Sequence, residues 1–139
     1  MGTPTQPQVP VRFAGYAGLF NIPDAESDTI LPGAFQASLS ARKTALPLLW
    51  QHRPNQQIGE IESIAEDKRG LRVIARIDHA NSRAAQLLAW GKVSGLSFGY
   101  RARRAHHSNA GRELAEIDLF EVSLVTHPLQ HGARVHFIS

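Results

Sequence analysis

The ten residues KVSGLSFGYR, from Lys92 to Arg101, decide the fold, and their centre is Gly95-Leu96-Ser97-Phe98-Gly99. In a β-strand, successive side chains point to opposite faces of the sheet. One face then carries the large apolar side chains of Leu96, Phe98 and Tyr100. On the other face, Ser97 stands between two glycines, and glycine inside a strand often marks close approach of a backbone or ligand. A barrel bend beside a small polar residue explains the same pattern. The stretch therefore predicts a strand and leaves the role of Ser97 open.

The composition is that of one globular domain. The chain has 139 residues, of which 42% are hydrophobic and 19% charged, and no cysteine, which excludes disulfides and cysteine zinc sites. No apolar run approaches the roughly 20 residues of a membrane helix. The segment Met1–Pro10 is polar and proline-rich, unlike a secretion signal. We expect a flexible N-terminal tail over residues 1–10, a single domain over residues 11–139, an intracellular location and no membrane partner.

The charge does not favour nucleic acid as a partner. The net charge is +3, but most basic residues are scattered along the sequence. One cluster, within residues 101–107, has three arginines and two histidines, and Ser108–Gly111 follows it like a hairpin connection. A solvated loop explains this cluster more simply than a phosphate-binding patch.

The rest of the sequence predicts further strands and two short helices. Apolar and polar residues alternate clearly over 71–78, and we expect other strands over 11–20, 45–52, 57–65, 113–125 and 134–138. A first helix follows Pro32-Gly33 to about Leu39, and Asn81-Ser82 caps a second helix that ends near Trp90. We expect turns at residues 21–24, 53–55 and 66–70. The fold class is mainly β with short helices (α+β), as a compact β-barrel of six or more strands flanked by helices.

Three residues on separate predicted strands form a candidate catalytic set: His52, Ser97 and Glu121. If residues 45–52 stay extended, His52 ends a run of alternating apolar side chains at the rim of the core. Serine is a poor nucleophile unless a base takes its proton and a third group orients that base. His52 and Glu121 fit these two roles. Each also has a structural explanation, as a histidine satisfied at the core or a carboxylate facing solvent from an edge strand.

Five short motifs follow one another between Phe13 and Val135. They are Phe13-Ala14-Gly15-Tyr16-Ala17 with Phe20-Asn21, Ile30-Leu31-Pro32-Gly33-Ala34-Phe35, Leu49-Trp50-Gln51-His52 with Ile58-Gly59, Val93-Ser94-Gly95-Leu96-Ser97-Phe98-Gly99-Tyr100, and Glu121-Val122-Ser123-Leu124-Val125-Thr126. In this order they resemble the prohead (capsid maturation) proteases of HK97-like tailed phages. That family is related in fold to the herpesvirus assembly proteases.

The resemblance implies a serine endopeptidase with Ser97 as nucleophile, His52 as base and Glu121 as the acidic third member. His127 is an alternative third member, because herpesvirus relatives use a second histidine, and Asp118 is a weaker rival. The implied enzyme acts in the host cytoplasm, within the assembling procapsid. It cleaves the scaffold portion of the major capsid protein and then itself, needs no cofactor, and is plausible as a homodimer.

The residues around Ser97 leave several roles open. The backbone at Phe98 and Gly99 is the expected oxyanion site, with Arg101 as a further candidate for oxyanion or substrate binding. Ser94 is predicted to face away from Ser97. Ser123 shares the face of Glu121, and a structural role is favoured for it over one in lining the site.

Two other interpretations compete with the protease. Neither of them involves a metal: no metal site is expected from His127, His131 and His136, because Pro128 opposes a helix that would align the first two.

The first of these two interpretations is a non-enzymatic β-barrel that binds nucleic acid or takes part in capsid assembly, and it is motivated by the basic cluster. A family member that has lost its activity is the second interpretation.

Overall fold

The structure, a computed structural model, describes residues 9–139. The predicted tail lies almost wholly outside these residues. Within them are eight strands and two helices: β1 (Val11–Leu19), β2 (Asp28–Ile30), α1 (Gln36–Ala41), β3 (Pro47–Trp50), β4 (Arg53–Glu66), β5 (Gly70–Ile77), α2 (Arg83–Ala89), β6 (Gly95–Ser108), β7 (Gly111–Val125) and β8 (Val135–Ile138). Neither helix is long and apolar enough to cross a membrane.

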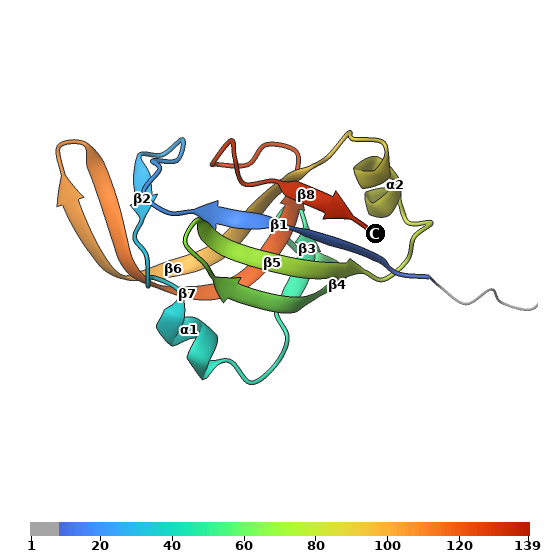
Figure 1. Cartoon of the computed structure of the whole chain (residues 1–139), viewed down its shortest axis with the longest axis horizontal. Helices are drawn as coiled ribbons and strands as arrows, with labels where there is room; N and C mark the ends of the chain where they lie inside the picture. Colours follow the sequence, from blue (N-terminus) through green and yellow to red (C-terminus); the bar gives the residue numbers. More distant parts are fainter. Residues whose placement is uncertain (1–8) are drawn as a thin grey trace, which may run out of the picture.

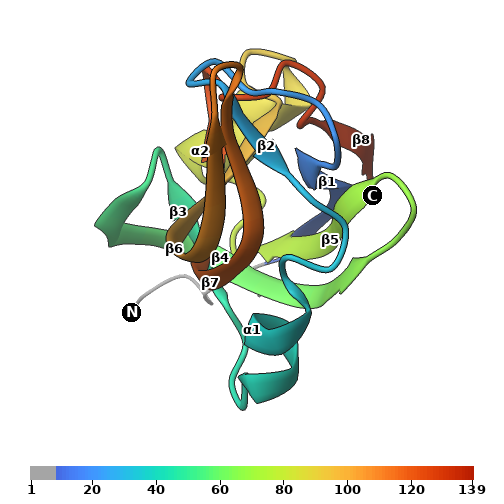
Figure 2. The same cartoon turned by 90° about the vertical axis from the view of Figure 1, so that its left-hand side faces the viewer.

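All eight strands belong to one sheet. Its order is β2-β7-β3-β4-β5-β1-β8, and β6 pairs with the remaining edge of β7. The sheet curls so that β1 and β8 approach the start of β6, where the Leu96 N–H donates to the Ala133 carbonyl at 2.8 Å (Figures 1 and 2). Both helices lie outside this curl. The mainly β fold with flanking short helices is therefore confirmed.

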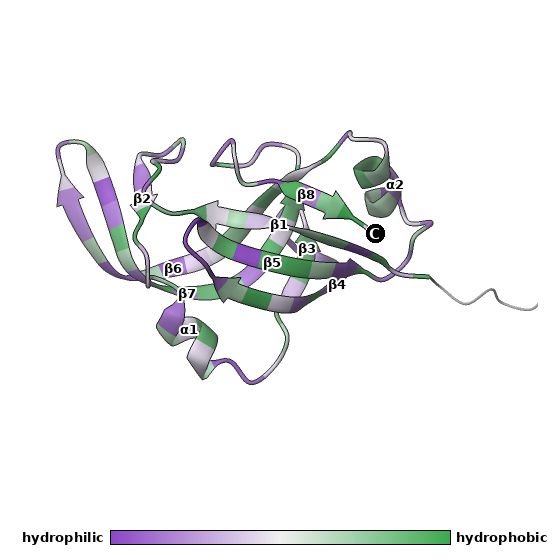
Figure 3. Ribbon diagram, in the orientation of Figure 1, coloured by the Kyte–Doolittle hydropathy of each residue, from purple (hydrophilic) through white to green (hydrophobic). Residues whose placement is uncertain are grey.

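Strand alternation builds the core. Leu71, Val73, Ala75 and Ile77 of β5 are fully buried, while Arg72 between them is exposed. On β6 and β7, Leu96 and Leu124 lie opposite each other and are also fully buried. Figure 3 shows the apolar residues on the central strands and a largely hydrophilic outer end of the β6–β7 hairpin. The inner faces of β5, β6 and β7 thus form one core, and their outer faces remain for polar groups.

The sequence predicts a solvated loop for the basic cluster, and the structure shows a strand there instead. Residues 101–108 continue β6 and pair with β7 as far as Ser108 opposite Gly111, so that only Asn109 and Ala110 form the turn. Cross-strand ion pairs such as Arg101 with Asp118 accompany this pairing. One face of this hairpin packs on the core through Ala102 and Ala105, opposite the buried Ile117 and Leu114. Register shifts between Ala102 and Ala105 interrupt the period of two, so the segment lacks the alternation of a half-buried strand.

One shorter prediction was also wrong, and one short strand was missed. Residues 53–55 are the start of β4 rather than a turn, because the preceding two residues already reverse the chain. Strand β2 was not predicted, because its three residues are too few to show a periodic pattern. β2 pairs in parallel with residues 112–114 of β7.

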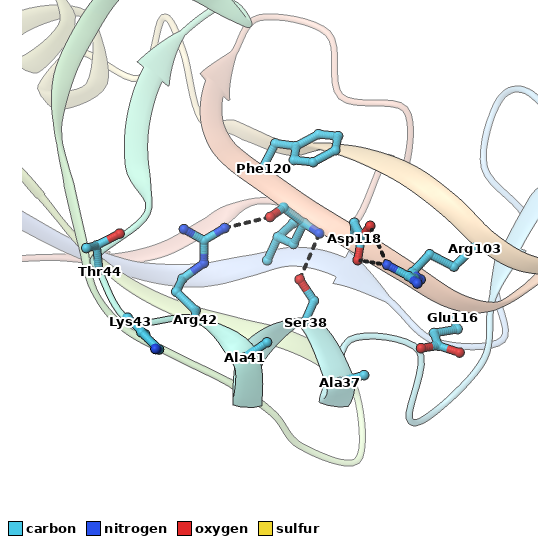
Figure 4. Close-up of a pocket in the computed structure, with 11 residues that line it drawn as sticks. Ala37, Ser38, Ala41, Arg42, Lys43, Thr44, Arg103, Glu116, Asp118 and Phe120 are labelled. Atoms are coloured by element: carbon cyan, nitrogen blue, oxygen red, sulfur yellow. Dashed lines mark hydrogen bonds and ion pairs between the residues drawn. The ribbon is translucent and has the colours of Figure 1, made fainter.

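Helix α1 fills a gap along β7 between the stretches that pair with β2 and β3. The Ile117 N–H donates to the Ala34 carbonyl at 3.1 Å, and the Leu119 N–H donates to Ser38 Oγ at 2.9 Å. Arg42 Nη2 donates to the Leu119 carbonyl at 2.7 Å (Figure 4). A hollow of about 550 Å³ lies beside these contacts. Side chains and backbone of the α1 region thus replace a missing strand and fix the part of β7 that leads to Glu121.

Candidate active site

His52 lies in the two-residue loop that joins β3 to β4. Trp50 pairs with Arg53, and the residues between them, Gln51 and His52, have φ values of 52° and 59°. Positive φ at both central residues is typical of a type I′ hairpin loop, in which asparagine and glycine are preferred. For other residues, this left-handed conformation costs about 1–2 kcal/mol each. The prediction that His52 continues the apolar face of an extended strand is therefore wrong.

The loop carries His52 onto the outer face of β7, where three residues close a ring of hydrogen bonds. His52 Nδ1 lies 2.5 Å from Glu121 Oε1. Ser123 Oγ donates to Glu121 Oε2 at 2.6 Å and accepts from the His52 backbone N–H at 3.1 Å. The Glu121 side chain is 12% exposed, whereas the imidazole is 42% exposed. The carboxylate engages Nδ1, so Nε2 is the ring nitrogen left for another group.

Strand register places Ser97 on this same face. Ser97 lies opposite Ser123, and Gly99 lies opposite Glu121. Directly opposed residues of antiparallel strands share a face, with Cβ atoms about 4.5–5.5 Å apart. Ser97 is 7% exposed. Within residues 9–139, no hydrogen bond joins its hydroxyl to the His52 ring, and such contacts are often long in unliganded enzymes.

The two glycines around Ser97 make room for other parts of the site. A Cβ atom at Gly99 would lie 2.5 Å from Glu121 Oε1, and one at Gly95 would lie 2.7 Å from Pro128 Cδ. The pairing also skips Phe120, which creates a bulge beside Glu121, and bulges often redirect side chains next to active sites. The close approach that the sequence predicted at these glycines thus comes from Glu121 and from the chain after β7.

The rivals of Glu121 lie elsewhere. Asp118 forms ion pairs with Arg101 at 3.3 Å and with Arg103 at 3.1 Å. His127 follows the end of β7, is exposed, and has no hydrogen bond within the described part of the chain. The structure therefore places Glu121, and neither of these residues, against the His52 ring.

The other predicted site residues differ in their accessibility. The Phe98 ring packs edge-on against Phe35 at a centroid distance of 5.2 Å, so its side chain faces the core. The Arg101 side chain is 71% exposed and is directed to Asp118. Ser94 Oγ accepts a hydrogen bond from Arg134 Nη1 at 3.1 Å. The side chain of Phe98 is therefore not available to a reaction at Ser97, and only its backbone N–H and carbonyl can take part.

Sequence reasoning gave too little weight to one residue and missed another. Ser123 is completely buried and contacts both His52 and Glu121, although a structural role was favoured for it over one in lining the site. Gln51 was not singled out. Its Oε1 accepts from the Thr126 N–H at 3.1 Å, and its Nε2 donates to Thr126 Oγ1 at 2.6 Å. A Gln-His loop lacks the asparagine and glycine that signal a tight hairpin turn in a sequence.

A second polar cluster lies farther out on the same hairpin. Asp28 accepts two hydrogen bonds from Arg112, at 2.9 and 3.1 Å, and one from the Tyr100 hydroxyl at 3.3 Å. The hydrogen bond from Arg112 lowers the pKa of Asp28, although burial acts in the opposite direction. Burial raises the pKa of Tyr100, and the charge of Asp28 adds to this effect. Across the described residues, no three His, Cys, Asp or Glu side chains gather as a metal site would require.

Solved structures with a similar fold are herpesvirus proteases. The protease of KSHV in complex with a hexapeptide phosphonate inhibitor has a TM-score of 0.63 and 13% identity, covering 94% of this chain and 65% of that chain. The varicella-zoster virus protease has a TM-score of 0.60 and 17% identity, covering 94% and 64%. At these identities the likeness extends to the fold alone.

Sequence comparison is more specific. The prohead protease of Enterobacteria phage HK97 is 33% identical over 130 residues, which cover 88% of this chain and 58% of that protein. The chain therefore spans little more than half the length of this relative. The family model described as caudovirus prohead serine protease matches residues 5–139. Because that match takes in nearly the whole sequence, the chain belongs to the caudovirus prohead serine protease family.

Proposed function

We propose that this protein is a serine endopeptidase of capsid maturation in a tailed phage. It cleaves the scaffold portion of the major capsid protein, and then itself, inside the procapsid in the host cytoplasm. The observation that carries the proposal is the contact between His52 and Glu121 on the face of the sheet that also holds Ser97. Family membership supports the same chemistry.

The proposed mechanism gives each of the three side chains one task. Ser97 Oγ attacks the scissile carbonyl carbon, and His52 Nε2 takes the hydroxyl proton and then delivers it to the leaving amine. Glu121 holds the Nδ1 side of the imidazole and stabilises its protonated form. Water then attacks the acyl-enzyme ester, again with His52 as base, and releases Ser97.

Of the two residues expected at the oxyanion site, the backbone N–H of Phe98 is the proposed donor, because it points to the same edge of β6 as the Leu96 N–H. The N–H of Gly99 points to the opposite edge, toward β7. Arg101 is less suitable for that task, because its guanidinium is directed to Asp118. A homodimer remains a prediction from the resemblance.

An open strand edge supports an extended peptide as substrate. One edge of β6 pairs with β7, and among residues 9–139 no strand pairs with its other edge from Ser97 outward. An extended peptide can add to such an edge through main-chain hydrogen bonds. A peptide bound in this way would bring a carbonyl carbon to Ser97.

The alternative as a nucleic-acid-binding barrel has less support. Arg101 and Arg103 both pair with Asp118, and Arg104 lies 4.0 Å from Glu116. Carboxylates on the same hairpin therefore neutralise part of the basic cluster on which this alternative depends.

The test is processing of the capsid precursor during co-assembly with Ser97→Ala. We expect normal folding and no processing, with Ser94→Ala as a matched control because Ser94 bonds to Arg134. Full processing by Ser97→Ala would reject the proposal. An inactive family member would leave the precursor uncut even with the wild-type chain and would not react with a fluorophosphonate.

A further inference from the structure

We propose that Gln51 is a positioning residue of this site, whose side-chain amide clamps the loop that carries His52 to the end of β7. The inference rests on the proposed function, because it assigns Gln51 a role in that reaction. Within the described residues, the Gln51 side chain has hydrogen bonds to Thr126 and none to the Ser97 hydroxyl or the imidazole, so it acts through the placement of His52.

The clamp consists of hydrogen bonds between the loop and a single strand end. The Gln51 amide bonds to Thr126 through both of its polar atoms, at 3.1 and 2.6 Å. The Gln51 backbone N–H donates to the Leu124 carbonyl at 3.0 Å. The neighbouring His52 N–H donates to Ser123 Oγ at 3.1 Å. These hydrogen bonds attach the loop to the same strand that carries Glu121. The position of His52 is therefore fixed relative to the carboxylate that orients it.

The backbone of the loop explains why a clamp is needed. Both Gln51 and His52 adopt positive φ, which neither side chain favours. Asparagine tolerates this conformation better, but its side chain is one methylene shorter than that of glutamine. The preference of residues for this turn does not explain a glutamine at position 51. The length of its side chain does, because it allows the amide to bond to Thr126.

Loss of the clamp should slow the chemistry without weakening binding. The imidazole is 42% exposed, and Glu121 is its one hydrogen-bond partner in the described structure. A freed loop would hold Nε2 near Ser97 for a smaller fraction of the time. Misplacement of a catalytic group by about 1 Å can cost about a hundredfold in rate, and such a loss falls on the maximal rate.

The first experiment measures labelling of Ser97 by a fluorophosphonate in the full chain, as a maximal rate and a half-saturation concentration. Gln51→Ala should lower the maximal rate about tenfold or more and change the half-saturation concentration less than about twofold. Gln51→Gly should do the same while the melting temperature stays equal or rises, because glycine suits positive φ. Gln56→Ala is the matched control, because Gln56 is an exposed glutamine of the same hairpin.

Variants of Thr126 separate the clamp from a general effect on the loop. Thr126→Val should reduce the maximal rate, and Thr126→Ser, which keeps the hydroxyl, should restore it. In the Gln51→Ala background, Thr126→Val should have no further effect, because the partner of its hydroxyl is already absent. An undiminished effect of Thr126→Val in that background would overturn the proposal.

A third measurement does not depend on activity. Hydrogen exchange of the His52 amide, which bonds to Ser123 Oγ, should be about tenfold faster in Gln51→Ala and unchanged in Gln56→Ala. If the wild-type chain is not labelled at all, the proposed function fails, and this exchange rate alone decides whether the clamp exists. Unchanged exchange, or unchanged labelling by an active chain in both Gln51→Ala and Gln51→Gly, would overturn the proposal.

Discussion

Two nearly buried carboxylates on or against the β6–β7 hairpin, Asp28 and Glu121, have similar surroundings and different partners. Each accepts from a hydroxyl group, Asp28 from Tyr100 and Glu121 from Ser123. Asp28 faces Arg112, a permanent cation, whereas Glu121 faces an imidazole. An arginine fixes a charge in place, whereas a histidine can gain and lose a proton near neutral pH. The comparison indicates that the Asp28 cluster holds β2 against β7 and that the Glu121 cluster is suited to proton transfer.

The largest expected effect is on the Glu121 side of this comparison. His52→Ala should lower the rate of precursor processing by about a thousandfold or more, since removal of a base disables the nucleophile. The free energy of unfolding should fall by about 1 kcal/mol, because the nearly buried Glu121 loses the imidazole but keeps the hydrogen bond from Ser123. Quantitative processing assays and thermal unfolding check both expectations. His127→Ala is the control, and an equal loss of activity from it would return the third-member assignment to His127.

Gly99→Ala should sharpen the comparison by moving one carboxylate alone. The new Cβ would lie 2.5 Å from Glu121 Oε1, so the carboxylate must shift away from His52. We expect about a tenfold or greater loss of processing rate. A structure of the variant should show Glu121 displaced and the Asp28 cluster unchanged. Wild-type activity with Glu121 undisplaced would contradict the role given to Gly99.

Arg112→Ala should break the structural carboxylate site. It leaves Asp28 buried without its cation, which should lower the free energy of unfolding by about 2 kcal/mol. Arg112 is 33% exposed, which keeps this value below that of a fully buried pair. Denaturant unfolding measures the loss, and Arg103→Ala, from a more exposed pair, should cost less than about 1 kcal/mol. Equal losses of unfolding free energy in the two variants would show that the Asp28–Arg112 pair stabilises the fold no more than an exposed ion pair does.

The smallest expected effect is on how the free energy of unfolding depends on pH in acid. The pKa of Asp28 is lowered in the folded state, so its contribution to stability is present above its unfolded pKa of about 3.9 and is lost as pH falls further. Unfolding free energy measured between pH 2 and pH 5 should therefore fall less steeply for Asp28→Asn than for the wild type. Some slope should remain, because hydrogen bonds from Arg12 and Tyr16 also lower the pKa values of Glu62 and Asp67. An identical slope in the variant would contradict the lowered pKa.

Much of the fold could be predicted because it follows from alternation. Residues 71–77 alternate between buried and more accessible positions as expected, and Ser82 caps α2 by accepting from the Ala85 N–H. The outer hairpin could not be predicted in the same way, since the register shifts between Ala102 and Ala105 break the apolar period of β6. The site was predicted through the glycines around Ser97 and the family resemblance.

The geometry around His52 could not be predicted from the sequence. Its position depends on two positive φ values, which neither glutamine nor histidine signals. Gln51 and Ser123 take part through bonds to residues far away in the chain, from the loop to β7. Such contacts depend on which strands become neighbours, and the parallel pairing of β3 with β7 is a tertiary feature.

The central claim is that His52, Ser97 and Glu121 act together at one face of the sheet. Mass spectrometry of the chain after reaction with a fluorophosphonate tests it most directly. We predict a single adduct on Ser97 in the wild type, and its loss in His52→Ala while Ser94→Ala keeps it. An adduct on another serine, or none in a wild-type chain that still cuts its precursor, would contradict the claim.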